Sequence, residues 1–415
     1  MAIAKLRCGG AFLCSETAGV TVGGGQTVKY REPVIMLRHH HEKHIMYWAC
    51  CAGLFLFGMV LALPAAVALD LRLHYGLDAV AAGALTFRMP LGLLAGSVLV
   101  GIVSGGLGYR FVMAAAALGM FAGFRGVAFA GGAGALEGWM FCLGVSGGMM
   151  NGAANAWVAD TTVRGKGASL SLLGVSFGAG LLALPQLMLA LTREWPWQEV
   201  LQGIGYFALG LAMLFMLMRF PVRRQSVALR RLLSDGTLWW MGIFLFFQAA
   251  FESVLYQWGA RYLSAGLGWG DREAVFGLML CVAGMTVMRL LLGSVFRNIA
   301  PRQMLAVSLL LLPAGMLLLK PVGGFVPAAV GMMLLGGGLA GGFPIMLGFV
   351  GERYPGISGG AMGMVMGIAV EGRLLVDGMM MWGMWEWGIQ YLAALALIGW
   401  VAMLALGAMI VKRLR

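Results

Sequence analysis

Three charged residues stand close together in a stretch of the chain that is otherwise typical of a membrane span. Glu371, Arg373 and Asp377 interrupt the apolar run GAMGMVMGIAVEGRLLVDGMMMW. An ionised group at the bilayer centre costs roughly 2.5–3.5 kcal/mol on insertion scales, so such groups face a partner or a water-filled path. Arg373 and Asp377 are four residues apart, which predicts an ion pair along one helix face. Glu371 lies on another face and is predicted either to carry protons or to join a structural ion pair.

A second polar face is predicted in the span 237–262. Gln248, Glu252 and Tyr256 follow one another at intervals of four residues, which places them on one side of a helix. Glu252 lies about 22 Å along that helix, near mid-membrane. Desolvation favours the protonated form of a carboxyl group there, which suits a proton carrier. Glu252 is therefore the first candidate for proton coupling and Glu371 the second, with Gln248 and Tyr256 as substrate contacts. The alternative is a Glu252 that only bonds a neighbouring helix.

Other polar residues in predicted spans complete the candidate site. Asn151 and Asn155 are four residues apart with Trp157 nearby, so their amides could bond hydroxyls while the indole stacks on a sugar face. The alternative is hydrogen bonding between helices, which contributes about 0.6–2 kcal/mol in membranes. Arg88 shares its span with Pro90, which can kink the helix and turn Arg88 toward a cavity. Arg88, like the arginines at 125 and 289, is also an available partner for Glu371.

Composition indicates an integral membrane protein. Hydrophobic residues make up 60% of the chain and charged residues 11%, against about 25% charged in soluble domains. The 66 glycines let helices approach closely in lipid. The six cysteines and the run RHHHEKH have no metal-ligand spacing, so no metal and no cofactor are predicted. Motifs of ATP-driven pumps and of common membrane hydrolases are absent from the sequence, which argues against an enzyme with catalytic residues.

Twelve apolar stretches of roughly 17–25 residues are each long enough to cross about 30 Å of hydrocarbon. Residues 1–44 precede them and are predicted to be a disordered cytoplasmic tail, or translated sequence upstream of a true start near Met36. Most of the 29 Lys and Arg residues fall in the tail and in alternate loops. This bias predicts a multi-pass protein of the inner (cytoplasmic) membrane with both termini in the cytoplasm, and it explains the net charge of +12 without a nucleic-acid partner. The predicted spans are 45–69, 79–103, 110–130, 136–158, 168–191, 198–218, 237–262, 273–296, 303–319, 325–349, 358–382 and 388–411.

The basic segment 220–236 is a predicted cytoplasmic linker between two halves of six spans, 45–219 and 237–415. Both halves carry a Gly-rich fourth span, GVSGGMMNGAANAW and GGGLAGGFPIMLGFVG. Parallel halves of this kind place a substrate site at mid-membrane between them.

The arrangement resembles the major facilitator superfamily of secondary transporters. The family's loop signature G-x-L-A-D-R-x-G-R-K corresponds here to GIVSGGLGYR, with its glycines kept at Gly101 and Gly108. Gly105 takes the acidic position and Tyr109 that of the first arginine of the final basic pair. In the second-half copy, GSVFRNIAPR, Arg297 stands at the acidic position. The resemblance implies an all-α fold of twelve transmembrane helices in two six-helix repeats, a monomer in membrane lipid, and spans 1, 4, 7 and 10 around the cavity.

Span 7 has a further resemblance to fucose-permease-like members, which are proton-coupled sugar importers. Phe251, Glu252, Trp258, Tyr262 and Leu263 carry it within FLFFQAAFESVLYQWGARYL. We therefore predict secondary active transport of a small, sugar-like polar solute by alternating access, as symport with protons. The alternative is efflux of hydrophobic or amphipathic compounds by proton antiport. A third interpretation is a sensor that binds a ligand and signals without transporting it. Such a sensor would need a cytoplasmic effector domain, and the predicted tail at residues 1–44 is short for one.

Overall fold

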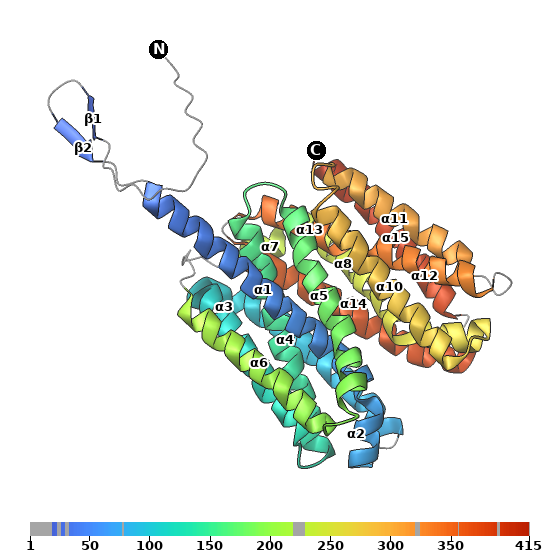
Figure 1. Cartoon of the computed structure of the whole chain (residues 1–415). Helices are drawn as coiled ribbons and strands as arrows, with labels where there is room; N and C mark the ends of the chain where they lie inside the picture. The colour runs from blue at the N-terminus through green and yellow to red at the C-terminus, as the bar shows by residue number, and fades with distance from the viewer. Residues whose placement is uncertain are drawn as a thin grey trace. The chain divides into compact units, whose positions relative to one another are not determined.

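The computed structural model describes residues 19–22, 26–29, 33–76, 79–218, 229–319, 324–355, 357–387 and 391–414 (Figure 1). The chain divides into two compact units, Met1–Trp48 and Ala49–Arg415.

The first unit contains a β-hairpin where the sequence predicts a disordered tail. Strand β1 (Gly19–Val22) pairs antiparallel with β2 (Gln26–Lys29), and Gly19 lies opposite Lys29. Alternating Val and Thr favour strands, and the glycines between them favour a turn. Helix α1 (Pro33–Ala66) then begins twelve residues before the predicted first span. Most of the remaining predicted tail lies outside the described residues.

The second unit is helical, with two sets of membrane spans in chain order (Figure 1). After α1, the first set consists of α2 (Ala68–Tyr75), α3 (Ala79–Ala128), α4 (Ala133–Thr161), α5 (Lys166–Leu191) and α6 (Trp197–Leu217). The second set consists of α7 (Leu229–Ser234), α8 (Gly236–Ser253), η1 (Val254–Trp258), α9 (Gly259–Arg261), η2 (Tyr262–Gly266), α10 (Asp271–Gly293), α11 (Pro301–Leu318), α12 (Phe325–Leu339), α13 (Gly342–Arg353), α14 (Ser358–Trp387) and α15 (Tyr391–Arg413). The predicted linker lies mostly outside the described residues.

Each predicted span corresponds to helix. Ten segments of the described chain are long and apolar enough to cross a membrane. One of them, within α3, holds two predicted spans, because α3 bends at Gly108 (φ 76°, ψ 157°), a conformation that glycine adopts without strain. Helix α4 accounts for the remaining span. The architecture is therefore the twelve-helix one expected.

The span that starts with α8 contains wide turns. The segments η1 and η2 are π-helical, with hydrogen bonds to the fifth residue along the chain. Each wide turn adds a residue, so faces separated by η1 are rotated from their α-helical positions. At its start, α8 is capped by Asp235, whose carboxylate accepts a hydrogen bond from the Thr237 backbone N–H at 2.9 Å.

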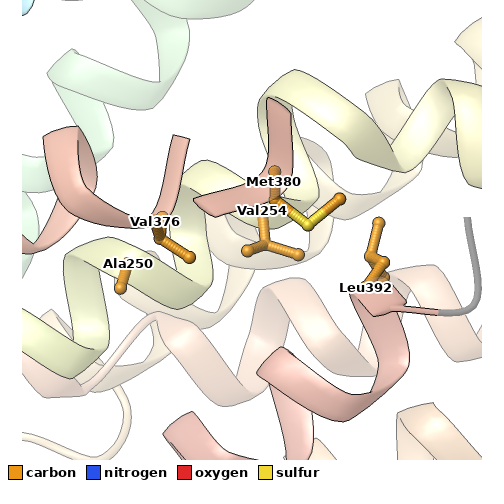
Figure 2. Packing of buried hydrophobic residues seen from close by; sticks show 5 residues of the cluster. All are labelled: Ala250, Val254, Val376, Met380 and Leu392. Atoms are coloured by element: carbon orange, nitrogen blue, oxygen red, sulfur yellow. The ribbon is translucent and has the colours of Figure 1, made fainter. Parts of the chain in front are cut away.

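Small residues bring the helices of this unit into backbone contact. A Cβ at Gly363 of α14 would lie 2.8 Å from the backbone of Gly101 in α3, so these helices touch without side chains between them. Larger apolar residues fill other contacts. Figure 2 shows one such cluster, in which side chains of α8, η1, α14 and α15 converge. Its members are Ala250, Val254, Val376, Met380 and Leu392.

Candidate substrate site

A cavity lies where the two sets of helices meet. It is partly open to solvent. Helices α1, α3, α4 and α5 contribute its lining from the first set, and α8, α10, α13 and α14 from the second. Most lining side chains are apolar, so the few polar groups among them determine which ligand can bind.

Glu252 lines this cavity and is held in place by Gln248. The Gln248 amide nitrogen donates to Glu252 Oε1 at 3.0 Å and to the Leu339 carbonyl at 2.8 Å. Gln248 is 1% exposed and is not among the residues lining the cavity. Gln248 and Glu252 therefore share one helix face, as predicted. Gln248 orients Glu252, however, and does not contact the cavity as a substrate-binding residue was expected to do.

The Leu339 carbonyl is available because the tenth predicted span is broken into two helices. Helix α12 ends at Leu339, and Pro344 in α13 has no N–H to donate to the Ala340 carbonyl. Gln248 donates to the first of these carbonyls, and Arg289 Nε approaches the second at 3.5 Å. Irregular backbone at membrane depth needs such partners from the protein. Two polar side chains thus stabilise a helix break beside the cavity.

Arg289 connects the two sets of helices. Its backbone carbonyl accepts a hydrogen bond from Ser171 Oγ at 2.8 Å, and its Nη1 donates to the Gly174 carbonyl of α5 at 3.3 Å. The guanidinium lies 5.6 Å from the Phe177 ring centre. Arg289 lines the cavity, is 4% exposed and interacts electrostatically with Glu252. Sequence reasoning considered it only as a partner for Glu371, because the relative placement of α8 and α10 cannot be read from spacing.

The charged residues of α14 have different hydrogen-bonding partners. Arg373 lines the cavity, and its Nε is buried without a hydrogen-bond partner in the described chain. The Ser253 hydroxyl donates to the carboxylate of Asp377, with Oγ 2.8 Å from Oδ1 and 3.0 Å from Oδ2. Arg373 and Asp377 interact electrostatically, but the pairs closer than 4.0 Å among described residues do not include them. Spacing alone could not show that α8 presents a serine to Asp377.

Glu371, the second proton-coupling candidate, is exposed and does not line the cavity. Its neighbour Gly372 packs against the Phe246 backbone of α8, where an added Cβ would lie 2.2 Å from the carbonyl oxygen. That contact fixes the rotation of α14, so that Arg373 faces the cavity and Glu371 faces away from it.

The paired asparagines of α4 both line the cavity. Asn155 Nδ2 donates to the Asn151 backbone carbonyl at 2.8 Å and to Asn151 Oδ1 at 2.9 Å. The amide nitrogen of Asn151 itself faces Met366 Sδ at 3.8 Å. A thioether is a weak acceptor, so the Asn151 amide remains the available donor of the pair.

The structure places three other candidates away from the cavity lining. Trp157 is 3% exposed in α4. Tyr256 belongs to the wide turn η1, and its hydroxyl donates to Met285 Sδ at 3.0 Å. Arg88 is exposed and forms an ion pair with Glu137 of α4 at 2.9 Å. The kink expected at Pro90 therefore does not direct Arg88 into the cavity.

One end of the bundle is closed by polar contacts between the two sets of helices. Asp160 accepts hydrogen bonds from the Tyr109 hydroxyl at 2.8 Å and from Ser358 Oγ. Lys166 Nζ donates to the Gly351 carbonyl at 2.8 Å. We call these five residues the polar clasp. The Gly101–Gly363 backbone contact involves the same helices, α3 and α14, as Tyr109 and Ser358 of the clasp.

A family model described as Major Facilitator Superfamily matches residues 48–375. The chain belongs to the major facilitator superfamily. Its members are membrane transporters, so this protein is a transporter and not an enzyme. The predicted family, the predicted fold and the predicted membrane-spanning character are confirmed. No curated protein sequence matches the chain.

Solved transporters of this superfamily share the fold at low sequence identity. The proton:xylose symporter XylE has a TM-score of 0.77 at 14% identity, over 88% of this chain and 94% of that one. The Escherichia coli fucose:proton symporter FucP has a TM-score of 0.73 at 16% identity, over 88% and 98%. The human organic anion transporter TETRAN has a TM-score of 0.69 at 17% identity, over 87% and 98%.

Proposed function

We propose that this superfamily member is a proton-coupled symporter of a small polar solute, of sugar size, that works by alternating access. The observation that carries the proposal is the position of Glu252. It lines a cavity at the junction of the two helix sets, where its carboxylate is oriented by Gln248 and faces two arginines. A carboxyl group in such a place can bind a proton together with the solute on one side of the membrane. It can release both after the cavity opens to the other side.

The structural neighbours support this choice, since two of them are described as proton symporters of xylose and fucose. The distribution of basic residues supports an inner-membrane protein with cytoplasmic termini, and the likeness to the superfamily supports a monomer. On that orientation the polar clasp lies at the cytoplasmic end, and the cavity is closed toward the cytoplasm.

Efflux by proton antiport is a second candidate because of the largely apolar lining. Phe57, Phe177, Phe343 and Met366 all contribute to it, and such walls suit amphipathic compounds. The neighbour described as an organic anion transporter is consistent with a cavity that takes less polar solutes. Counterflow with a panel of sugars and a panel of lipophilic cations separates the two candidates.

Uptake into proteoliposomes with an imposed proton gradient tests the coupling. Wild type is expected to accumulate solute, whereas Glu252→Gln is expected to exchange solute without accumulating it. Glu371→Gln is the matched control, because that carboxyl group lies on another face of the neighbouring helix α14 and should leave accumulation unchanged. Accumulation by Glu252→Gln at the wild-type level would refute the proposed role of Glu252.

A further inference from the structure

We propose that the solute is an organic monocarboxylate, whose carboxylate binds Arg373 while Arg289 supplies a second positive charge. The inference rests on the proposed function in one respect, namely that the cavity is the transport site. It deepens that function by replacing a neutral sugar with an anion of similar size.

The charges that line the cavity favour an anion. Its ionisable lining side chains are Glu252, Arg289 and Arg373. Arginine keeps its proton at all physiological pH values. The cavity therefore carries a net charge of +1 when Glu252 is ionised and +2 when Glu252 is protonated. Asp377 interacts electrostatically with Arg373 but is not part of the lining, and a neutral sugar would add no counter-charge within the cavity.

The two arginines differ in how far their donors are already used. Arg289 donates to the Gly174 and Ala340 carbonyls, so its guanidinium is fixed in position by the backbone. Arg373 has a buried Nε without a hydrogen-bond partner in the described chain, and no carboxylate there lies within 4.0 Å of it. A buried N–H without an acceptor is unfavourable, because it has lost its hydrogen bonds to water and gained none in return. A planar carboxylate matches the guanidinium fork and would offset that cost.

The neutral groups around Arg373 indicate what the rest of the ligand must be. The Asn151 amide opposes only a thioether and is free to donate to a second oxygen or a hydroxyl. The wall nearby is apolar, with Met366 and Val370 on the turns of α14 before Arg373. A carboxylate with a short body, hydroxylated or aliphatic, satisfies this set of donors and surfaces.

Proton and anion binding should then promote each other. The charged and titratable groups that interact with Glu252 are Arg289 and Cys281 of α10, Arg373 of α14, and Tyr256 on the continuation of its own helix. Protonation of Glu252 removes the only negative charge of the described lining, which favours an incoming anion. By linkage, the bound anion favours protonation by the same factor. One proton moving with one monocarboxylate carries no net charge.

Electroneutrality provides a test that separates this inference from the proposed function. We would measure counterflow and gradient-driven uptake in proteoliposomes for gluconate and xylose, with and without a potassium-diffusion potential. Gluconate is a hydroxylated monocarboxylate of sugar size, and xylose is the neutral comparison. The expected result is proton-driven uptake of gluconate that the potential does not change.

Variants test the contact itself. Arg373→Gln should raise the KM for the transported carboxylate at least tenfold, Arg373→Lys should raise it less, and Arg88→Gln should leave it unchanged. Arg88 is the matched control because its ion pair with Glu137 lies away from the cavity. Arg289→Lys keeps the second positive charge, so it shows whether loss of function in Arg373→Gln is a folding defect common to changes at these arginines.

Each outcome decides between the two proposals. Potential-driven xylose uptake without carboxylate transport overturns the anion inference and leaves proton symport standing. Carboxylate counterflow that depends on Arg373, without accumulation of the carboxylate under a proton gradient, supports anion binding and contradicts proton coupling. Absence of carboxylate counterflow, or equal KM values in Arg373→Gln and wild type, overturns the inference.

Discussion

Replacing Gly363 with alanine should open the closed end of the transporter. Gly363 faces α3 with no side chain in between, and a Cβ there would lie 2.8 Å from the Gly101 Cα and N and from the Ser97 carbonyl oxygen. These atoms are all backbone, so no rotamer change can relieve the contact. The helices must separate by about 0.6 Å to reach the 3.4 Å at which ordinary van der Waals contact begins.

The expected energy is that of overpacking a rigid contact, about 1–3 kcal/mol. The cost applies only to the conformation in which α3 and α14 touch. A free-energy change of 1.4 kcal/mol corresponds to a factor of ten. The ratio of molecules closed at this end to molecules open there should therefore fall about tenfold.

Pulsed electron resonance between two spin labels reports this population without reference to membrane orientation. We would label Val163→Cys, which is 90% exposed before α5, and Glu352→Cys, exposed near the end of α13, after replacing the natural cysteines. Gly363→Ala should enlarge the long-distance fraction. Gly367→Ala is the matched control one turn along α14, where an added Cβ would meet only Val98 and Leu94 side chains at 3.6 and 3.9 Å. Equal distance distributions in the two variants would refute the steric argument.

Two further predictions concern the same end of the bundle. Asp160→Asn should also enlarge the long-distance fraction, because the clasp would lose its charged acceptor. Hydrogen bonds to a charged acceptor contribute about 1.5–3 kcal/mol. An unchanged distance distribution in the same measurement would exclude the clasp as a determinant of closure. Asp235→Ala should lower stability by about 1 kcal/mol through loss of the α8 cap, whereas Asp235→Asn keeps a capping side chain, and thermal unfolding in detergent at neutral pH compares them. Desolvation raises the pKa of Asp235, but the Tyr354 hydroxyl, the Thr237 N–H and the Arg353 guanidinium together hold it below its ordinary value. The contribution of the Asp235 charge to stability is therefore present above the unfolded-state pKa of about 3.9 and is lost as the pH falls below that value. The difference in unfolding temperature between wild type and Asp235→Asn should shrink in acid. A difference that stays constant with pH would contradict this.

The lengths of the spans could be predicted from the sequence because the bilayer itself sets them. Continuous apolar runs located the helices, whereas the continuation of the second into the third through a bend at Gly108 was a finding of the structure. The hairpin at 19–29 was missed because its strands are four residues each and lie in a polar tail. Local composition gives little warning of such short pairings.

The site was only partly predictable because it depends on which helices face one another. Glu252 and the two asparagines were found from spacing, and they line the cavity. Arg289 was not assigned to the site. The hydrogen bond from the Ser253 hydroxyl to Asp377 was missed because Ser253 belongs to another helix. Tyr256 left the expected face because the wide turn η1 begins two residues before it.

The clasp also accounts for the altered loop signature. Where the family motif has a charged acid and an arginine, this chain has Gly105 and Tyr109. The Tyr109 hydroxyl reaches Asp160 at the end of α4, and Ser358 of the other helix set shares that acceptor. A single carboxylate bonded by hydroxyls thus connects the halves here.

The wide turns η1 and η2 have a consequence for how this span can change in evolution. A π-helical turn holds one residue more than an α-helical turn, so loss of one residue from 254–258 would convert it to a regular turn and leave both flanking segments on their present faces. In an ordinary transmembrane helix the same deletion would rotate everything beyond it by about 100°. Variation in the length of this span among related transporters is therefore expected to fall within these turns, on the side of Glu252 away from Gln248.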